Sequence, residues 1–204
     1  MLTGLNFLLK IMPNKKNGVN LIELIVCMIL MSLVVLGFFS IEIFSRHHVV
    51  SSDRRSKLQV DISYSIEYMS KYVQQSTGDV NNPPITLVTI SSSDGFRVRV
   101  DLNDPKTPGN LSDDTWVNFY LDGHELKTLQ GATTEVLTNK IVGAFEGSVM
   151  PEFPDKGFYV SITDQGTAVD IGLVGRYNPA SAASADNPQI AMKTRLVSPS
   201  ASAH

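Results

Sequence analysis

An uncharged apolar stretch of eighteen residues, Leu24 to Ile41, limits the possible folds of this 204-residue chain more than any other feature. As a helix that rises about 1.5 Å per residue it spans roughly 27 Å, close to the hydrocarbon thickness of a bilayer. Its apolar residues surround the helix axis, whereas a helix of a soluble core has a single apolar stripe. A cleaved secretory signal has an apolar region of only about 7–15 residues with small residues after it, but here Glu42 and Arg46 follow a longer stretch. We therefore expect a retained membrane helix.

Composition excludes several classes of protein. The chain has 17 basic and 20 acidic residues and near-average glycine and proline, which excludes a collagen-like, coiled-coil or wholly disordered chain. Cys27 is the only cysteine, so we expect neither a disulfide framework nor a multi-thiolate metal site. Residues 77–170 contain six basic and fourteen acidic residues, a charge of −8 that disfavours direct binding of nucleic acid.

The helix is predicted to continue beyond the membrane as an amphipathic segment. Five apolar residues recur there at helical spacings of four, four, three and four: Leu58, Ile62, Ile66, Met69 and Val73. Thr77-Gly78 and the Asn-Asn-Pro-Pro that follows predict the end of the helix. We expect residues 19–45 to form its transmembrane half and residues 46–76 to pack by one face on a domain.

From residue 77 to residue 197 the pattern changes to the alternation of antiparallel strands. Residues 96–102 alternate strictly, as in a half-buried strand. Residues 116–129 predict a hairpin that turns at Asp122-Gly123, and residues 158–173 predict a second hairpin. A last strand follows an Ala- and Ser-rich loop at 177–188 and precedes a tail, 198–204, that we expect to be disordered. The predicted fold class is therefore α+β, with a long amino-terminal transmembrane helix that continues into a globular domain with an antiparallel sheet packed on it.

A short motif precedes the apolar stretch. A basic leader with Lys15 and Lys16 ends in Gly18, and Glu23 stands five residues later, at the start of the apolar stretch. This combination resembles the processing site of type IV pilins and type II secretion pseudopilins, whose prepilin peptidase cuts after the glycine and methylates the new amino terminus. The resemblance implies a leader of residues 1–18, cleavage between Gly18 and Val19, and N-methylation of Val19. A start at Met12 would give a shorter and more typical leader.

The same resemblance implies that Glu23 acts in subunit assembly. A carboxylate in hydrocarbon costs about 2.5–3.5 kcal/mol on insertion scales. The positive end of its own helix and the amine of Val19, four residues earlier, are two possible partners within the chain. In the pilin family the partner is instead the free amine of a neighbouring subunit, a pairing that sets the axial register of the fibre. The amine of Val19, whether of the same or of a neighbouring subunit, becomes free only after the leader has been removed.

Later features are similar in order to those of the W-type minor pilins and J-type pseudopilins, from Trp116-Val-Asn-Phe-Tyr-Leu-Asp-Gly to a final strand after Asn187-Pro188-Gln189. The resemblance implies a lollipop fold and a minor type IV pilin, a structural subunit in the initiation and assembly of a pilus. Expected partners are other minor and major pilins, the prepilin peptidase, the inner-membrane assembly platform and membrane lipid. The expected location is the bacterial inner membrane, with a single span and the carboxyl-terminal domain outside the cytoplasm, and the pilus after assembly. Two alternatives are a type II secretion pseudopilin and a single-span membrane-anchored binding or sensor domain.

The sequence predicts no catalytic residue, metal site or cofactor. His47-His48 adjoins the membrane segment, and His124 flanks a predicted turn. Residues 101–105 begin like a calcium loop, but Pro105 and the lack of the following glycine break the EF-hand pattern. The sequence has no glycine-rich phosphate loop and no nucleophile elbow. We therefore expect a protein that is not an enzyme.

Overall fold

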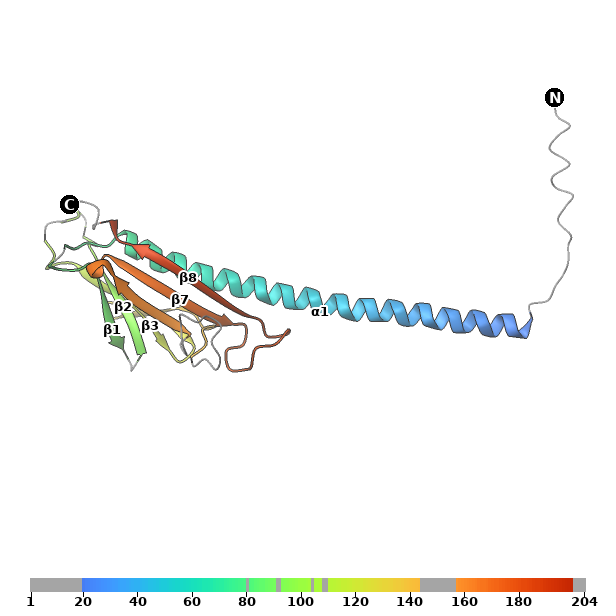
Figure 1. Ribbon diagram of the computed structural model, residues 1–204. Helices are drawn as coiled ribbons and strands as arrows, with labels where there is room; N and C mark the ends of the chain where they lie inside the picture. The colour runs from blue at the N-terminus through green and yellow to red at the C-terminus, as the bar shows by residue number, and fades with distance from the viewer. Residues whose placement is uncertain are drawn as a thin grey trace, which may run out of the picture. The chain divides into compact units, whose positions relative to one another are not determined.

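A computed structural model describes residues 20–79, 81–90, 93–103, 105–107, 110–143 and 157–199 (Figure 1). The predicted leader and the cleavage site Gly18–Val19 lie outside these residues. The elements are, in chain order, α1 (Leu21–Gln74), β1 (Ile85–Ile90), β2 (Ser93–Val100), β3 (Thr115–Asp122), β4 (Glu125–Gln130), β5 (Thr133–Thr138), β6 (Phe158–Thr163), the short 3₁₀ helix η2 (Asp164–Gly166), β7 (Ala168–Arg176) and β8 (Gln189–Val197). The predicted α+β class is confirmed, because one long apolar helix precedes antiparallel strands that pack on it.

Two compact units divide the chain between Arg46 and His47, and α1 runs through both. The first unit contains the apolar part of the helix, whose described side chains are all exposed. The second unit contains the remainder of α1 and every strand of the described chain. The hydrophobic core therefore belongs to the second unit.

In the second unit, α1 packs on the strands by one face, as the helical spacing predicts. Its buried residues are Leu58, Ile62, Ser65, Met69 and Val73. Ser65 takes the central place that the pattern gave to Ile66, which is only half-buried. Burial of this hydroxyl is tolerated because Ser65 Oγ donates to the carbonyl of Asp61 at 2.9 Å.

The helix ends where the glycine and proline signals predict. Ser76 Oγ donates to the carbonyl of Val73 at 2.6 Å and lies 2.6 Å from the hydroxyl of Ser198. Ser198, which the sequence placed in a tail, is thus buried against the end of α1. Asp79 Oδ1 then accepts the backbone N–H groups of Asn82 and Asn81 at 2.7 and 2.8 Å, and these hydrogen bonds lower the pKa of Asp79.

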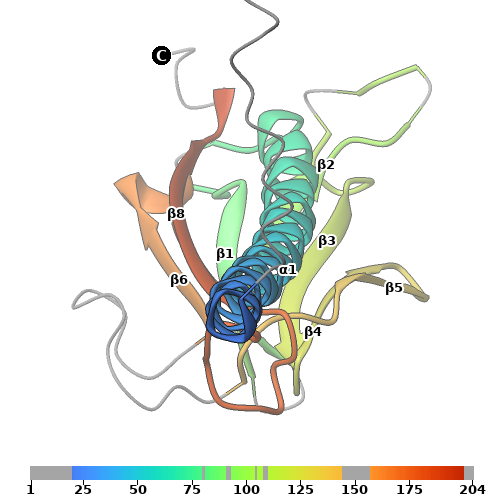
Figure 2. The same ribbon diagram turned by 90° about the vertical axis from the view of Figure 1, so that its right-hand side faces the viewer.

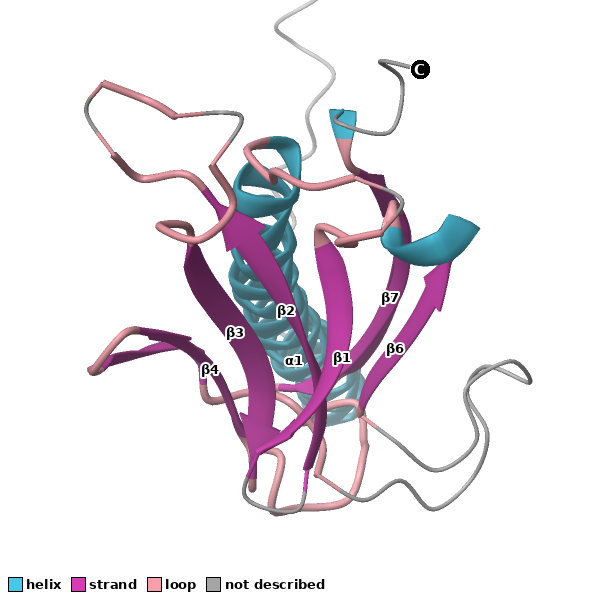
Figure 3. Ribbon diagram, turned by 90° about the vertical axis from the view of Figure 1, so that its left-hand side faces the viewer, coloured by secondary structure: helices cyan, strands magenta, loops and turns pink. Residues whose placement is uncertain are grey.

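The strands form two antiparallel sheets rather than the single sheet that we expected. One has the order β1-β2-β3-β4-β5 and the other the order β6-β7-β8. In Figure 3, β1, β2 and β3 lie side by side across the second-unit part of α1. Figure 2 looks along the helix, with β6 and β8 on one side of it and β3, β4 and β5 on the other. The two sheets therefore curve around one face of the helix.

Both predicted hairpins are present. The β3–β4 turn is shifted by one residue, because Asp122 pairs with Glu125 and the two loop residues are Gly123 and His124. Gly123 has a φ of 61°, a left-handed conformation that glycine adopts without strain. The β6–β7 hairpin turns through η2, as expected. Two further hairpins, β1–β2 and β4–β5, were not predicted.

The core lies between α1 and the inner faces of both sheets. Phe96 and Phe119 are fully buried and stacked, with ring centroids 5.1 Å apart. Ile171 and Leu173 of β7 are also fully buried in this cluster. Because alternate strand residues point to opposite faces, Arg97 and Arg99, which alternate with core residues of β2, lie on the outer face of the five-stranded sheet.

The predicted loop at 177–188 is organised by its own amide side chains. Asn187 Nδ2 donates to the carbonyls of Asn178, Ser181 and Ala182 at 2.9–3.2 Å. Ser51 Oγ donates from α1 to the carbonyl of Ala185 at 2.7 Å. The loop is therefore held against the helix, although it has no regular secondary structure.

Candidate functional site

The amino-terminal turn of α1 positions Glu23. The carbonyl of Asn20 accepts the backbone N–H groups of Glu23 at 2.9 Å and of Leu24 at 3.1 Å, so the helix starts directly after Asn20. Glu23 is the acidic residue of this first turn. The partial positive charge at a helix amino terminus favours an anion there. The helix start therefore offsets part of the cost of placing a carboxylate in an apolar segment.

The Glu23 side chain is exposed, and it has no hydrogen bond or ion pair with any residue that the structure describes. Its neighbours Leu21, Ile22 and Leu24 are 76%, 65% and 48% exposed. Val19 lies outside the described residues, so a pair between its amine and Glu23 stays a prediction. Glu23 is thus a single carboxylate at the end of an otherwise apolar surface.

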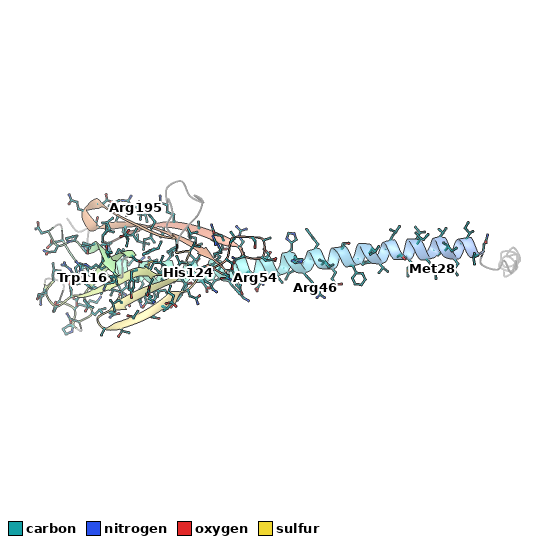
Figure 4. The ribbon with its side chains drawn as sticks, turned by 90° about the horizontal axis from the view of Figure 1, so that it is seen from below. Met28, Arg46, Arg54, Trp116, His124 and Arg195 are labelled. Atoms are coloured by element: carbon teal, nitrogen blue, oxygen red, sulfur yellow. The ribbon has the colours of Figure 1, made fainter. Side chains whose placement is uncertain are left out.

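The apolar stretch satisfies its few polar groups internally. Ser32 Oγ donates to the carbonyl of Met28 at 2.8 Å, and Ser40 Oγ donates to the carbonyl of Leu36 at 2.9 Å. Apolar side chains project on all sides of this segment, as Figure 4 shows around Met28. Exposed apolar side chains with internally bonded hydroxyls suit hydrocarbon, which offers no hydrogen-bond partner.

The next charged residues along α1 lie at the carboxyl end of the apolar stretch. Glu42 Oε1 accepts from Arg46 Nη2 at 2.6 Å, an ion pair between residues one helical turn apart. The 18-residue apolar segment between Glu23 and Glu42 makes α1 long and apolar enough to cross a membrane, judged by length and composition. The chain therefore has one candidate membrane span near its amino terminus.

The basic residues that follow this span, Arg54, Arg55 and Lys57, are partly engaged within the second unit. The Arg54 guanidinium lies 5.2 Å from the ring centroid of Tyr177 and donates to the carbonyl of Asp186. Lys57 Nζ lies 2.9 Å from Asp53 Oδ2, and this hydrogen bond raises the pKa of Lys57. Arg55 is exposed.

The candidate metal-binding residues do not come together. His124 Nδ1 lies 3.0 Å from the carbonyl oxygen of Ile141, and His47 Nδ1 lies 3.8 Å from Asp186 Oδ1. Asp101 Oδ1 and Oδ2 accept the backbone N–H groups of Asn103 and Thr107, so this carboxylate shapes its own loop. Within the described ranges, no group of three or more His, Cys, Asp or Glu side chains could hold a metal ion.

One polar cluster was missed by the sequence analysis. The guanidinium carbons of Arg97 and Arg99 lie 4.3 and 4.8 Å from the ring of Trp116, the only tryptophan. The two arginines alternate with core residues along β2, which was a sequence signal that they share one face. Their approach to Trp116 depends on the β2–β3 register, which places Arg99 opposite Trp116.

Comparison of the chain with known protein families, with curated proteins and with solved structures finds no match.

Proposed function

We propose that this chain is a minor type IV pilin, a structural and non-catalytic subunit in the initiation and assembly of a pilus. The observation that carries the proposal is Glu23, a carboxylate without a described partner at the amino end of the exposed apolar segment of α1. Its spacing of five residues from Gly18, behind a basic leader, resembles the prepilin processing site. The α+β fold adds support, because a helical anchor that continues into a sheet domain is the arrangement expected of pilins.

The physical role of Glu23 follows from its surroundings. A carboxylate at the edge of hydrocarbon is stabilised by an opposite charge, and a pair about 4 Å apart gains up to about 4 kcal/mol at an effective dielectric constant of 20. Cleavage after Gly18 would create such a charge, the amino group of Val19, on each subunit. We infer that Glu23 of one subunit binds the amine of its neighbour, so that cleavage controls competence for assembly.

Location and partners belong to the same proposal. The mature subunit crosses the bacterial inner membrane once through residues 19–45, and its sheet domain lies outside the cytoplasm. There it meets other minor pilins, the major pilin and the assembly platform. The internally bonded serines and the Glu42–Arg46 pair at the far end of the apolar segment support a single span.

The mass of the mature protein tests the proposal. Expressed in a host with an active prepilin peptidase, the membrane-extracted chain should begin at Val19 and carry one additional methyl group. A Gly18→Val variant should keep its leader, because a β-branched side chain replaces the glycine at the scissile bond. A wild-type chain recovered with its leader intact would contradict the pilin assignment and favour a membrane-anchored binding or sensor domain.

A further inference from the structure

Arg97, Arg99 and Trp116 form a patch on the outer face of the five-stranded sheet. Phe96, Val98 and Val100 point into the core, so Arg97 and Arg99 lie on the opposite face of β2. Both guanidinium groups lie within 5 Å of the Trp116 ring, at 4.3 and 4.8 Å. Stacking on an aromatic face holds a guanidinium in place and leaves its in-plane donors available. We name these three residues the arginine–tryptophan patch.

The charge of this patch contrasts with that of its surroundings. Arg97 Nε donates to Thr86 Oγ1 at 2.8 Å, and neither arginine forms an ion pair with a carboxylate in the described part of the chain. Asp79 and Arg99 attract each other electrostatically but form no ion pair. Asp79 Oδ1 already accepts two backbone N–H groups. Two stacked arginines without a paired carboxylate thus lie within residues 77–170, a segment whose net charge is −8.

A second surface has the complementary character. The face of α1 that the sheets leave open has a shallow, open depression of about 410 Å³ between side chains of α1 alone, lined by Ser56, Gln59, Val60, Ser63, Tyr64 and Glu67. Val60 and Tyr64 are 66% and 53% exposed. Glu67 is exposed, and no other described residue pairs with its carboxylate. We name this surface the Glu67 hollow.

The nearest basic residue of the helix does not neutralise Glu67. Lys71 follows one turn later, but its ammonium group lies 5.9 Å from the ring centroid of Tyr72. Lys193 of β8 lines the adjoining groove on the other side of Glu67. The lining of the Glu67 hollow itself contains one acidic residue and no basic residue.

We propose that the arginine–tryptophan patch of one copy docks into the Glu67 hollow of a second copy of this chain. The indole fits the apolar lining formed by Val60 and Tyr64, while the guanidinium groups reach the Glu67 carboxylate. Tryptophan and arginine are the residue types that most often dominate binding energy at protein interfaces. The two surfaces lie on different elements, so one head-to-tail contact between two copies leaves the hollow of the first copy and the patch of the second copy free.

This inference does not rest on the proposed function, and its experiment does not involve the processing site. The full chain, purified in detergent, is examined by sedimentation over a range of concentrations. Wild-type protein should associate reversibly. Glu67→Arg and the double change Arg97→Glu/Arg99→Glu should each weaken association at least about tenfold, because each places like charges across the contact. Asp61→Arg, the same change at an exposed residue outside the hollow, is the matched control and should associate like wild type.

Mixing the two charge-reversed proteins decides whether the surfaces meet each other. Each mixed pair restores opposite charges across the contact, so an equimolar mixture should associate although neither variant does so alone. Unchanged thermal melting of both variants shows that the fold is intact. Monomeric wild-type protein at all concentrations, unchanged association of Glu67→Arg, or no recovery on mixing would each overturn the proposal.

Discussion

At the scale of single residues, the exposed carboxylates differ in whether a basic group lies within reach. Glu42 has Arg46 at 2.6 Å, and Asp53 has Lys57 at 2.9 Å. Glu23 has no such neighbour among residues 20–46, the described part of the first unit. In the proposed membrane location a carboxylate is costly, and we propose that a partner that arrives with assembly offsets this cost.

A Glu23→Gln change separates the two possible roles of this carboxylate. It removes the charge and keeps the size and most of the hydrogen-bonding capacity of the side chain. We expect membrane insertion and cleavage after Gly18 to persist, while incorporation into the sheared filament fraction falls at least several-fold. The reason is the loss of one to a few kcal/mol, in order of magnitude, per contact with a neighbouring amine.

Glu42→Gln provides the matched control, because Glu42 already pairs within its own helix. This variant should enter filaments like wild type. Both proteins are quantified by immunoblotting of the sheared and membrane fractions. Normal incorporation of the Glu23→Gln protein beside wild-type partners would remove the intersubunit role and leave Glu23 satisfied within its own helix.

At the scale of elements, sequence patterns predicted the structures formed by neighbouring residues. They did not predict which strands pair to form each sheet. The helical stripe and the two hairpins follow from spacing and turn residues near in sequence. The division into two sheets does not, because it depends on which strands far apart in the sequence pair: β1 to β5 pair among themselves, and β6 to β8 pair among themselves. β5 was missed because the first four of its six residues are all exposed, so it lacks the alternation that marks a half-buried strand.

Packing of α1 on the strands predicts the effect of truncating its buried face. Ile62 is fully buried, and its side chain lies against Gly175 of β7, where a Cβ atom would come within 2.4 Å of Ile62 Cδ1. Ile62→Ala should lower the free energy of unfolding by about 2–5 kcal/mol, because it leaves a cavity between helix and sheet. Val60→Ala, two residues earlier and exposed, should change it by less than about 0.5 kcal/mol.

Urea unfolding followed by Trp116 fluorescence measures both variants, since Trp116 is the only tryptophan and lies in β3. A similar loss of stability in the two variants would show that the predicted buried face of α1 does not hold the sheets. A loss confined to Ile62→Ala would support the observed packing.

At the scale of the whole molecule, the candidate site and the core occupy different units. Glu23 and the apolar stretch could be identified from sequence alone, because their meaning depends on neighbours along the chain. The arginine–tryptophan patch could not, because it is assembled from two strands whose pairing the sequence does not specify. All core residues lie in the second unit, between Leu58 and Leu196.

This division predicts that residues 47–204 fold without the apolar segment of the first unit. A chain of about 150 residues buries roughly 68–70% of the surface that it exposes when unfolded, enough for an independent core. Cys27, the only cysteine, lies in the first unit, so no disulfide can contribute to this core. We expect the 47–204 chain to be soluble, to give a near-ultraviolet circular dichroism spectrum of fixed aromatic rings, and to unfold in one cooperative transition at the same temperature with and without reductant. The full chain in detergent, melted under the same conditions, is the reference and should show the same transition. A fragment that aggregates, or one that retains helix but loses its aromatic signal, would mean that the core requires residues 1–46 after all.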